Sequence, residues 1–88
     1  MTHLQIKATI ADIESKTDKN TNPYWRLSLQ GSPNYFYAFS FNLSESTRQT
    51  LTATPYNFIN RQVLITYQEL PNQNNQGTFF KVQQIEIV

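Results

Sequence analysis

The chain has 88 residues, of which 39% are hydrophobic and 15% charged, and its formal net charge is +1. This length favours one domain spanning residues 1–88, because chains divide into separate cores only at greater lengths. The sequence has no cysteine and a single histidine, His3. Disulfides and thiolate metal sites are therefore excluded, and we expect neither a metal nor a cofactor. The small net charge counts against a surface that holds nucleic acid by charge alone.

The N-terminal segment shows no targeting signal. Its first residues, MTHLQIKATI, lack a basic region followed by an apolar stretch. No apolar run in the chain approaches the ~18 residues that a membrane span requires. We therefore expect a cytoplasmic protein without a membrane partner.

Alternating hydrophobic residues predict the first two strands. In Leu4–Ser15 the even positions as far as Ile10 are apolar, and the next large apolar residue is Ile13. A bulge near Ala11 would absorb this change of phase. After a polar loop at residues 16–22 and Pro23, Tyr24–Gln30 alternates again. One face of this second strand carries Trp25, Leu27 and Leu29, and the opposite face carries Tyr24, Arg26 and Ser28.

The rest of the chain predicts three further strands and one helix. A turn at Gly31–Asn34 leads into a strand at Tyr35–Phe41. A helix follows at Glu45–Thr52, with Ser44 as its N-cap and Pro55 beyond its end. The last two strands are Gln62–Leu70 and Thr78–Val88, which are joined by a polar loop at Pro71–Gly77, and the second of them changes phase at Gln83–Gln84. The order β-β-β-α-β-β is that of the OB-fold. We therefore predict an all-β domain with one short helix, forming a five-stranded Greek-key barrel.

The segment Tyr24–Gly31 (YWRLSLQG) follows a loop rich in lysine and asparagine, and Phe41 closes the third strand. In these features the chain resembles the nucleic-acid-binding OB domains of replication protein A and of the bacterial replicative polymerase, over Ile6 to Ile87. Those domains usually have a glycine after the loop lysines and an acidic residue at the strand-two turn, where this chain has Asn20–Asn22 and Gln30. The resemblance implies a barrel that binds nucleic acid across strands two and three.

Binding of single-stranded nucleic acid requires cations along the backbone and flat side chains on which bases stack. If Trp25 faces the core, Tyr24 and Arg26 face outward and supply one group of each kind. The complete set of candidate nucleic-acid-binding residues is Tyr24 and Arg26, then Lys16 and Lys19, then Phe36, Phe79 and Lys81. If four of these, Lys16, Lys19, Arg26 and Lys81, each met a phosphate, log affinity would fall with log salt at a slope of roughly −3.

Several of these residues also have a purely structural interpretation. Tyr24 could cover the open end of the barrel, and Arg26 could pair with Asp18 or Glu69. One of Phe79 and its neighbour Phe80 must face inward, because neighbours in a strand face opposite ways. Phe36 could be a core residue. The odd positions of residues 35–41 are all aromatic, however, so we expect the odd side to be the core and Phe36 to be exposed.

These observations predict a non-catalytic protein that binds single-stranded DNA or RNA, weakly when alone, as a monomer or homodimer. The alternative is an OB-type adaptor for another protein subunit, because near-neutral charge with exposed aromatic residues suits a protein interface. An enzyme is not expected. Asp12 and Glu14 form the only close acidic pair, with no base, nucleophile or phosphate-binding glycine loop beside them.

Overall fold

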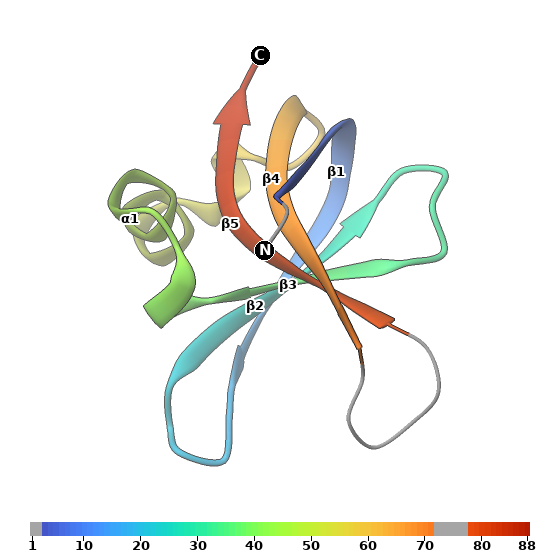
Figure 1. The fold of residues 1–88 in the computed structure, drawn as a ribbon. Coiled ribbons are helices and arrows are strands. Elements are labelled where there is room, and N and C mark those ends of the chain that lie inside the picture. The colour runs from blue at the N-terminus through green and yellow to red at the C-terminus, as the bar shows by residue number, and fades with distance from the viewer. Residues whose placement is uncertain (1–2, 72–77) are drawn as a thin grey trace.

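The computed structural model describes residues 3–71 and 78–88 (Figure 1). In this part of the chain the strands are β1 (Leu4–Thr17), β2 (Pro23–Leu29), β3 (Tyr35–Phe39), β4 (Gln62–Pro71) and β5 (Thr78–Ile87). They form a closed ring in the order β1-β2-β3-β5-β4. Neighbours in the ring are antiparallel except β3 and β5, which are parallel. The predicted five-stranded barrel of the OB type is confirmed.

The helical segments lie between β3 and β4. They are the 3-10 helix η1 (Ser40–Asn42), the α-helix α1 (Glu45–Ala53) and the 3-10 helix η2 (Pro55–Asn57). Strand β3 therefore ends two residues earlier than predicted, and α1 ends one residue later. Of the loop predicted at residues 71–77, Pro71 belongs to β4, and the remainder lies outside the described residues. No helix in the described part of the chain is long and apolar enough to cross a membrane.

Two irregularities in pairing allow the strands to close into a ring. The first half of β1 pairs with β4, and from Ile10 onward β1 pairs with β2. The register with β2 shifts between Ile10 and Asp12, where the sequence predicts a bulge. On β5, Val82 and Gln84 pair with consecutive residues of β4, so Gln83 is the extra residue. Bulges bend a strand and increase its twist, and both predicted changes of phase are confirmed.

The inward residues of β2 are the predicted ones. Trp25 is 4% exposed, Leu27 0% and Leu29 5%. They pack in one cluster with Ile10, and with Val63 and Ile65 of β4 and Val82 of β5. The alternation predicted for β2 is therefore confirmed, and it turns Tyr24, Arg26 and Ser28 outward.

The expectation that Phe36 is exposed is wrong. Its ring is 4% exposed, stacks on Phe80 at a centroid distance of 4.9 Å and meets Tyr67 edge-on at 5.0 Å. The reason is the register of the β2–β3 hairpin, in which Phe36 lies opposite the buried Leu27. Directly opposed residues share a face of an antiparallel pair. Phe36 is therefore a core residue, and it offers no surface to a ligand.

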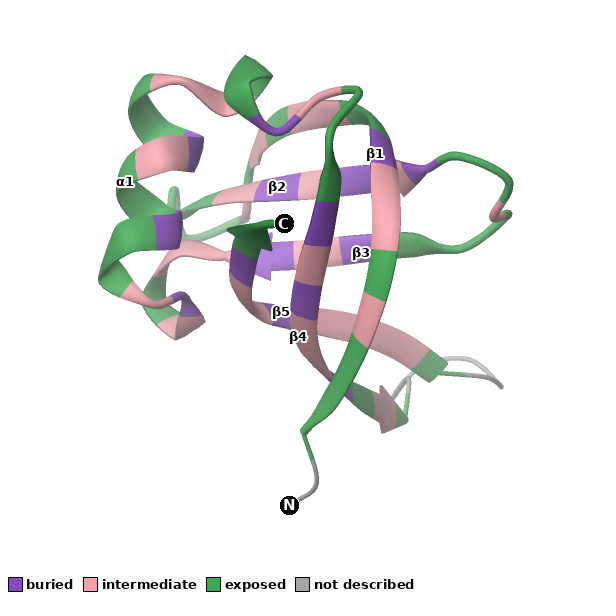
Figure 2. Ribbon diagram, turned by 90° about the horizontal axis from the view of Figure 1, so that it is seen from above, coloured by how far each residue is buried: buried purple, intermediate pink, exposed green. Residues whose placement is uncertain are grey.

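Helix α1 packs against one end of the barrel. Its buried residues are Thr47 and Leu51, and in Figure 2 the buried positions of α1 lie on the side toward the strands. The Thr47 hydroxyl accepts a hydrogen bond from the Ile85 N–H at 3.0 Å. Ser44 occupies the N-cap position but makes no side-chain cap; its hydroxyl donates instead to Thr47 Oγ1 at 2.9 Å. These contacts tie the helix to β5.

Candidate functional site

The outer side of β2, β3 and β5 carries a concentration of aromatic residues. Register places Tyr24 of β2 opposite Phe39 of β3, and Arg26 opposite Tyr37. Tyr37 in turn pairs with Lys81 of β5. We call this surface the aromatic face, defined by Tyr24, Tyr35, Tyr37, Phe39, Phe41 and Phe79. Tyr35 is 44% exposed and Phe41 66%, and the other four rings are partly exposed.

Three rings of the aromatic face follow one another in a row. The centroids of Tyr24 and Phe39 are 5.4 Å apart with an interplanar angle of 32°. Those of Phe39 and Phe41 are 5.9 Å apart with an angle of 31°. Both distances lie in the range at which aromatic pairs attract each other. The contacts hold the three rings in place, while Phe41 at the end of the row is largely open to solvent.

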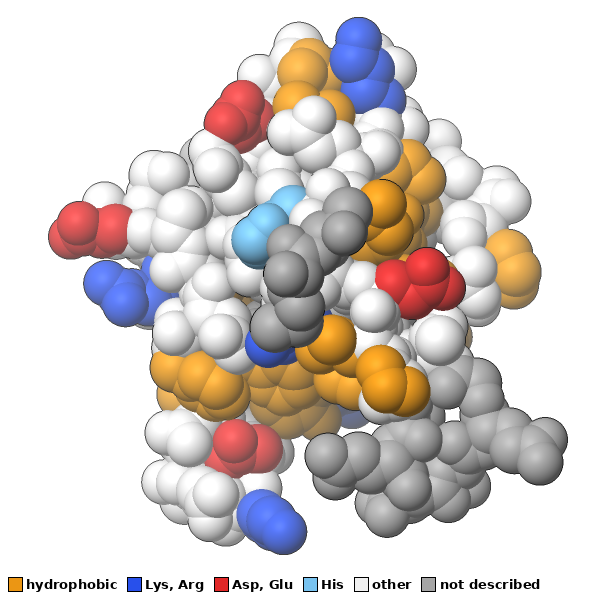
Figure 3. Space-filling model, viewed as in Figure 1, with side chains coloured by type: hydrophobic (Ala, Val, Ile, Leu, Met, Phe, Trp, Pro, Cys, Tyr) orange, Lys and Arg blue, Asp and Glu red, His pale blue; other side chains and the backbone are white. Residues whose placement is uncertain are grey.

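A groove of about 430 Å³ lies alongside this row, between β3 and β5. It is lined by Pro33, Asn34, Tyr35, Tyr37, Phe39, Thr78, Phe79 and Phe80. Its volume is in the range of small-ligand sites. Figure 3 shows hydrophobic side chains gathered in a band across the lower part of the molecule, above the β1–β2 loop. The groove thus combines the rings of Tyr35, Tyr37, Phe39 and Phe79 with polar groups on the outer surface of the barrel.

Phe79 and Phe80 divide between the two sides of β5, as strand geometry requires. Phe80 packs on Phe36 and contacts Tyr67 edge-on at 5.6 Å, so it belongs with the core cluster although it also reaches the groove. Phe79 shares the outward parity of Lys81 and lines the groove. Phe79 is therefore the ring of this pair that remains a candidate for ligand contact.

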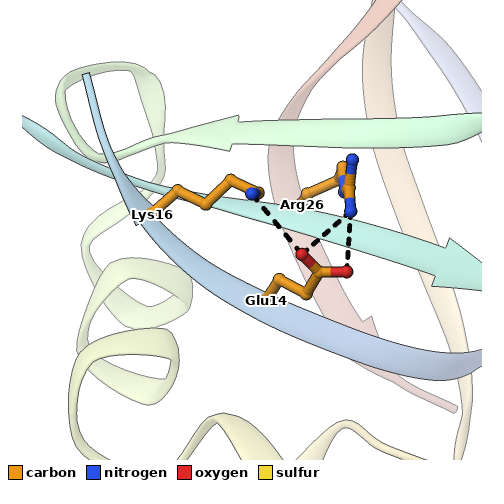
Figure 4. A network of polar contacts seen from close by, with 3 residues as sticks. All are labelled: Glu14, Lys16 and Arg26. Atoms are coloured by element: carbon orange, nitrogen blue, oxygen red, sulfur yellow. Dashed lines mark hydrogen bonds and ion pairs between the residues drawn. The ribbon is translucent and has the colours of Figure 1, made fainter. Parts of the chain in front are cut away.

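Arg26 is held by a carboxylate that lies directly across from it. Glu14 of β1 is the register partner of Arg26. Its two oxygens accept hydrogen bonds from Arg26 Nη2 at 2.7 and 2.8 Å (Figure 4). The Arg26 guanidinium also lies over the ring of Tyr35, 4.4 Å from its centroid. The alternatives raised from the sequence, pairing of Arg26 with Asp18 or Glu69, are wrong.

The hydrogen bonds between these residues shift both of their pKa values. Donation by Arg26 holds the pKa of the Glu14 carboxyl below its ordinary value, against a smaller opposing effect of desolvation. Acceptance by Glu14 raises the pKa of Arg26. Lys16 also lowers the pKa of Glu14, because its Nζ lies 3.5 Å from Glu14 Oε2. Glu14 therefore remains ionised near neutral pH, and its single negative charge faces the positive charges of Arg26 and Lys16.

The three candidate lysines have different surroundings. Lys16 belongs to β1, not to the loop, and lies opposite Tyr24. Lys19 is exposed in the β1–β2 loop, and Lys81 is partly buried on β5. Asp18 shapes that loop, since its carboxylate accepts the N–H groups of Asn20 and Asn22 at 2.8 and 2.9 Å. The structure thus brings Lys16, Tyr24, Arg26 and Lys81 onto one surface and leaves Lys19 at its margin.

Four residues of this surface were not predicted from the sequence as site residues: Tyr35, Tyr37, Phe39 and Glu14. A four-residue turn at Gly31–Asn34 would place Gln30 opposite Tyr35, so even residues of the second strand would share a face with odd residues of the third. That relation, combined with an inward Trp25, predicts the outward orientation of the three rings. The contact of Glu14 with Arg26 had a weaker signal, because it depends on where the β1 bulge lies.

Comparison with known proteins does not assign this site. No protein-family model matches the chain, and no curated protein matches it. Within residues 3–71 and 78–88, no group of three or more His, Asp or Glu residues is placed to hold a metal ion.

Proposed function

We propose that this protein binds single-stranded DNA or RNA across the aromatic face, without catalysing a reaction. The observation that supports the proposal is the row Tyr24–Phe39–Phe41, in which successive rings lie 5.4 and 5.9 Å apart on an outward surface. Bases stack on such rings with little regard to sequence, because every base has a flat face. In OB-folds the strand-two and strand-three face is the surface that binds oligonucleotides.

The charges around the row favour modest affinity. Lys19 and Lys81 make none of the ion pairs found among the described residues, whereas Lys16 and Arg26 are both paired with Glu14. Two phosphate contacts to a single strand correspond to a salt slope of about −1.4. Stacking, worth roughly 1–3 kcal/mol per base, would then supply most of the affinity. This revises the slope of roughly −3 expected when all four cations are available.

Fluorescence anisotropy with labelled oligothymidylate and oligouridylate of about 12 nucleotides tests the proposal, a length within the range of OB-fold sites. The variant Tyr37→Ala/Phe39→Ala removes two rings of the aromatic face and should weaken binding at least tenfold. Tyr56→Ala is the matched control, since Tyr56 is 67% exposed in η2 and lies off this face. The control should bind like the unmodified protein. Absence of binding at low salt, or an equal loss in both variants, would overturn the proposal.

A protein partner is the second candidate function, and the exposure of Phe41 favours it. A phenylalanine that is 66% exposed and contacts a second ring, that of Phe39, resembles the centre of a protein interface. A mainly apolar interface tolerates salt, whereas phosphate contacts do not. Affinity capture from lysate at high salt, with and without nuclease, separates the two functions. Retention of a protein that nuclease does not release, and that Phe41→Ala does release, would favour the adaptor.

A further inference from the structure

We infer that Glu14 is an internal substitute for phosphate on the aromatic face. Its carboxylate occupies the position on Arg26 that a backbone phosphate of a bound strand would take, and it thereby limits the affinity and the salt dependence of binding. This inference rests on the proposed function. It makes Glu14 a residue that limits affinity, since its carboxylate and the phosphates of the ligand compete for the same guanidinium.

The geometry of the contact is that of an arginine with an anion. Both carboxylate oxygens of Glu14 lie 2.7–2.8 Å from Arg26 Nη2. A guanidinium binds carboxylate and phosphate oxygens with the same planar donor groups, and such charge-assisted bonds are stronger than neutral ones. Lys16 Nζ, 3.5 Å from Glu14 Oε2, approaches the same carboxylate from β1. One carboxylate therefore engages two of the four cations that could meet a nucleic-acid backbone.

Arg26 has a second contact besides the one with Glu14. Its guanidinium lies 4.4 Å from the centroid of the Tyr35 ring, and its backbone is fixed between β1 and β3. Its Nε is buried and has no hydrogen-bond partner among the described residues, so Glu14 satisfies only part of the donor set. Loss of the carboxylate would leave the guanidinium on the outer face and able to accept another anion. The side chain of Arg26 is 28% exposed, which leaves a path for that exchange.

The number of available cations follows from this arrangement. With Glu14 ionised, Lys19 and Lys81 are available, and the expected slope of log affinity against log salt is about −1.4. With Glu14 neutral, Arg26 and Lys16 are added, and four contacts give about −2.8. The inference thus predicts a doubling of the slope when one negative charge is removed. A general change of net charge elsewhere on the barrel would not produce it.

The experiment compares Glu14→Gln with Glu86→Gln in salt titrations of labelled oligothymidylate. Both variants remove one negative charge, but Glu86 lies near the C-terminal end of β5 opposite Leu64, and the hydrogen-bond partner found for its side chain is Gln84. Glu14→Gln should bind about tenfold more tightly at low salt, with a slope near −2.8. Glu86→Gln should retain a slope near −1.4. In Glu14→Gln/Arg26→Gln the cations Lys16, Lys19 and Lys81 remain available, so the slope should fall back to about −2.1 and part of the gain should be lost.

The outcomes separate the inference from the proposed function. If the unmodified protein binds and Glu14→Gln shows the affinity and slope of Glu86→Gln, the inference is overturned and the proposed function stands. If neither the unmodified protein nor any variant binds, both fail. Near-UV circular dichroism checks the packing of Glu14→Gln. If that variant is unfolded, Glu14→Asp replaces it in the titration, because its carboxylate is one methylene farther from Arg26. A slope steeper than that of the unmodified protein then supports the inference. An unchanged slope overturns it.

Discussion

The two faces of β3 place aromatic rings in different surroundings. On the inner face, Phe36 is 4% exposed and contacts Phe80 and Tyr67 at 4.9 and 5.0 Å. On the outer face, Phe39 is partly exposed and contacts Tyr24 and Phe41 at 5.4 and 5.9 Å. Two residues of one short strand, three positions apart, thus make similar ring contacts on opposite sides of the sheet.

Ring contacts alone do not identify a binding surface. The inner and outer centroid distances both fall within the usual range for aromatic pairs. What separates the two groups is the apolar area already removed from water, since only a ring with exposed surface gains by covering it with a ligand. Substitutions on the inner face should therefore change the free energy of unfolding, and substitutions on the outer face should mainly change binding.

The largest effect is expected for Phe36→Ala. Removal of a buried phenylalanine ring leaves a cavity and costs about 3–5 kcal/mol of the free energy of unfolding. Urea denaturation followed by tryptophan fluorescence of Trp25 measures the loss. Phe41→Ala is the control and should change stability little, because Phe41 is 66% exposed. Equal losses in the two variants would show that the inner and outer faces do not differ as described.

Ala38→Leu tests the inner face by adding side-chain volume, whereas Phe36→Ala removes it. Ala38 is 0% exposed and lies opposite Trp25 in the β2–β3 pair. Added methylene groups in a close-packed interior force side chains out of their preferred rotamers, at a cost of about 1–3 kcal/mol. Thermal unfolding followed by circular dichroism measures it. An unchanged or raised midpoint would mean that the barrel interior has room at this point.

Phe39→Ala should separate stability from binding. The ring contributes to a cross-strand pair with Tyr24, so its loss should cost about 0.2–1 kcal/mol of the free energy of unfolding. Its loss as a stacking surface should cost roughly 1–3 kcal/mol of binding free energy. Urea denaturation and oligonucleotide anisotropy on the same sample give both values. A larger effect on unfolding than on binding would place Phe39 with the core.

The smallest effect is expected from the titration of Glu14. Because Arg26 lowers its pKa in the folded state, the contact contributes its full stability above the ordinary pKa range of glutamate. This contribution is lost as the pH falls through the lowered pKa. Urea midpoints measured from neutral pH downward should therefore decline less in Glu14→Gln than in the unmodified protein. Parallel declines would show that the contact does not stabilise the fold.

Much of the fold could be predicted from the sequence because local patterns carry it. The bulges near Ala11 and at Gln83 follow from interrupted alternation, and the helix from Glu45 follows from its polar start and the proline beyond it. The orientation of β3 could not be predicted by composition. A strand with aromatic residues on both sides gives no contrast between core and surface, and here the more aromatic side faces outward.

The candidate site was predicted in part. Tyr24 and Arg26 followed from the inward orientation of Trp25, which is confirmed. Phe36 was assigned to the wrong face, and the partner of Arg26 was sought in Asp18 and Glu69. Both errors concern residues that meet across strands. Such meetings depend on register, which alternation within one strand does not specify.

The alternation of residues, the interruptions of the strands and the turns could all be predicted from the sequence, because they depend on neighbours along the chain. Contacts between strands fixed which carboxylate holds Arg26, and they turned the more aromatic side of β3 away from the core. Those outcomes depend on hydrogen-bond register between strands, and a shift of one residue exchanges the two faces. The same register sets Glu14 against Arg26 and Phe39 against Tyr24 on one outer surface.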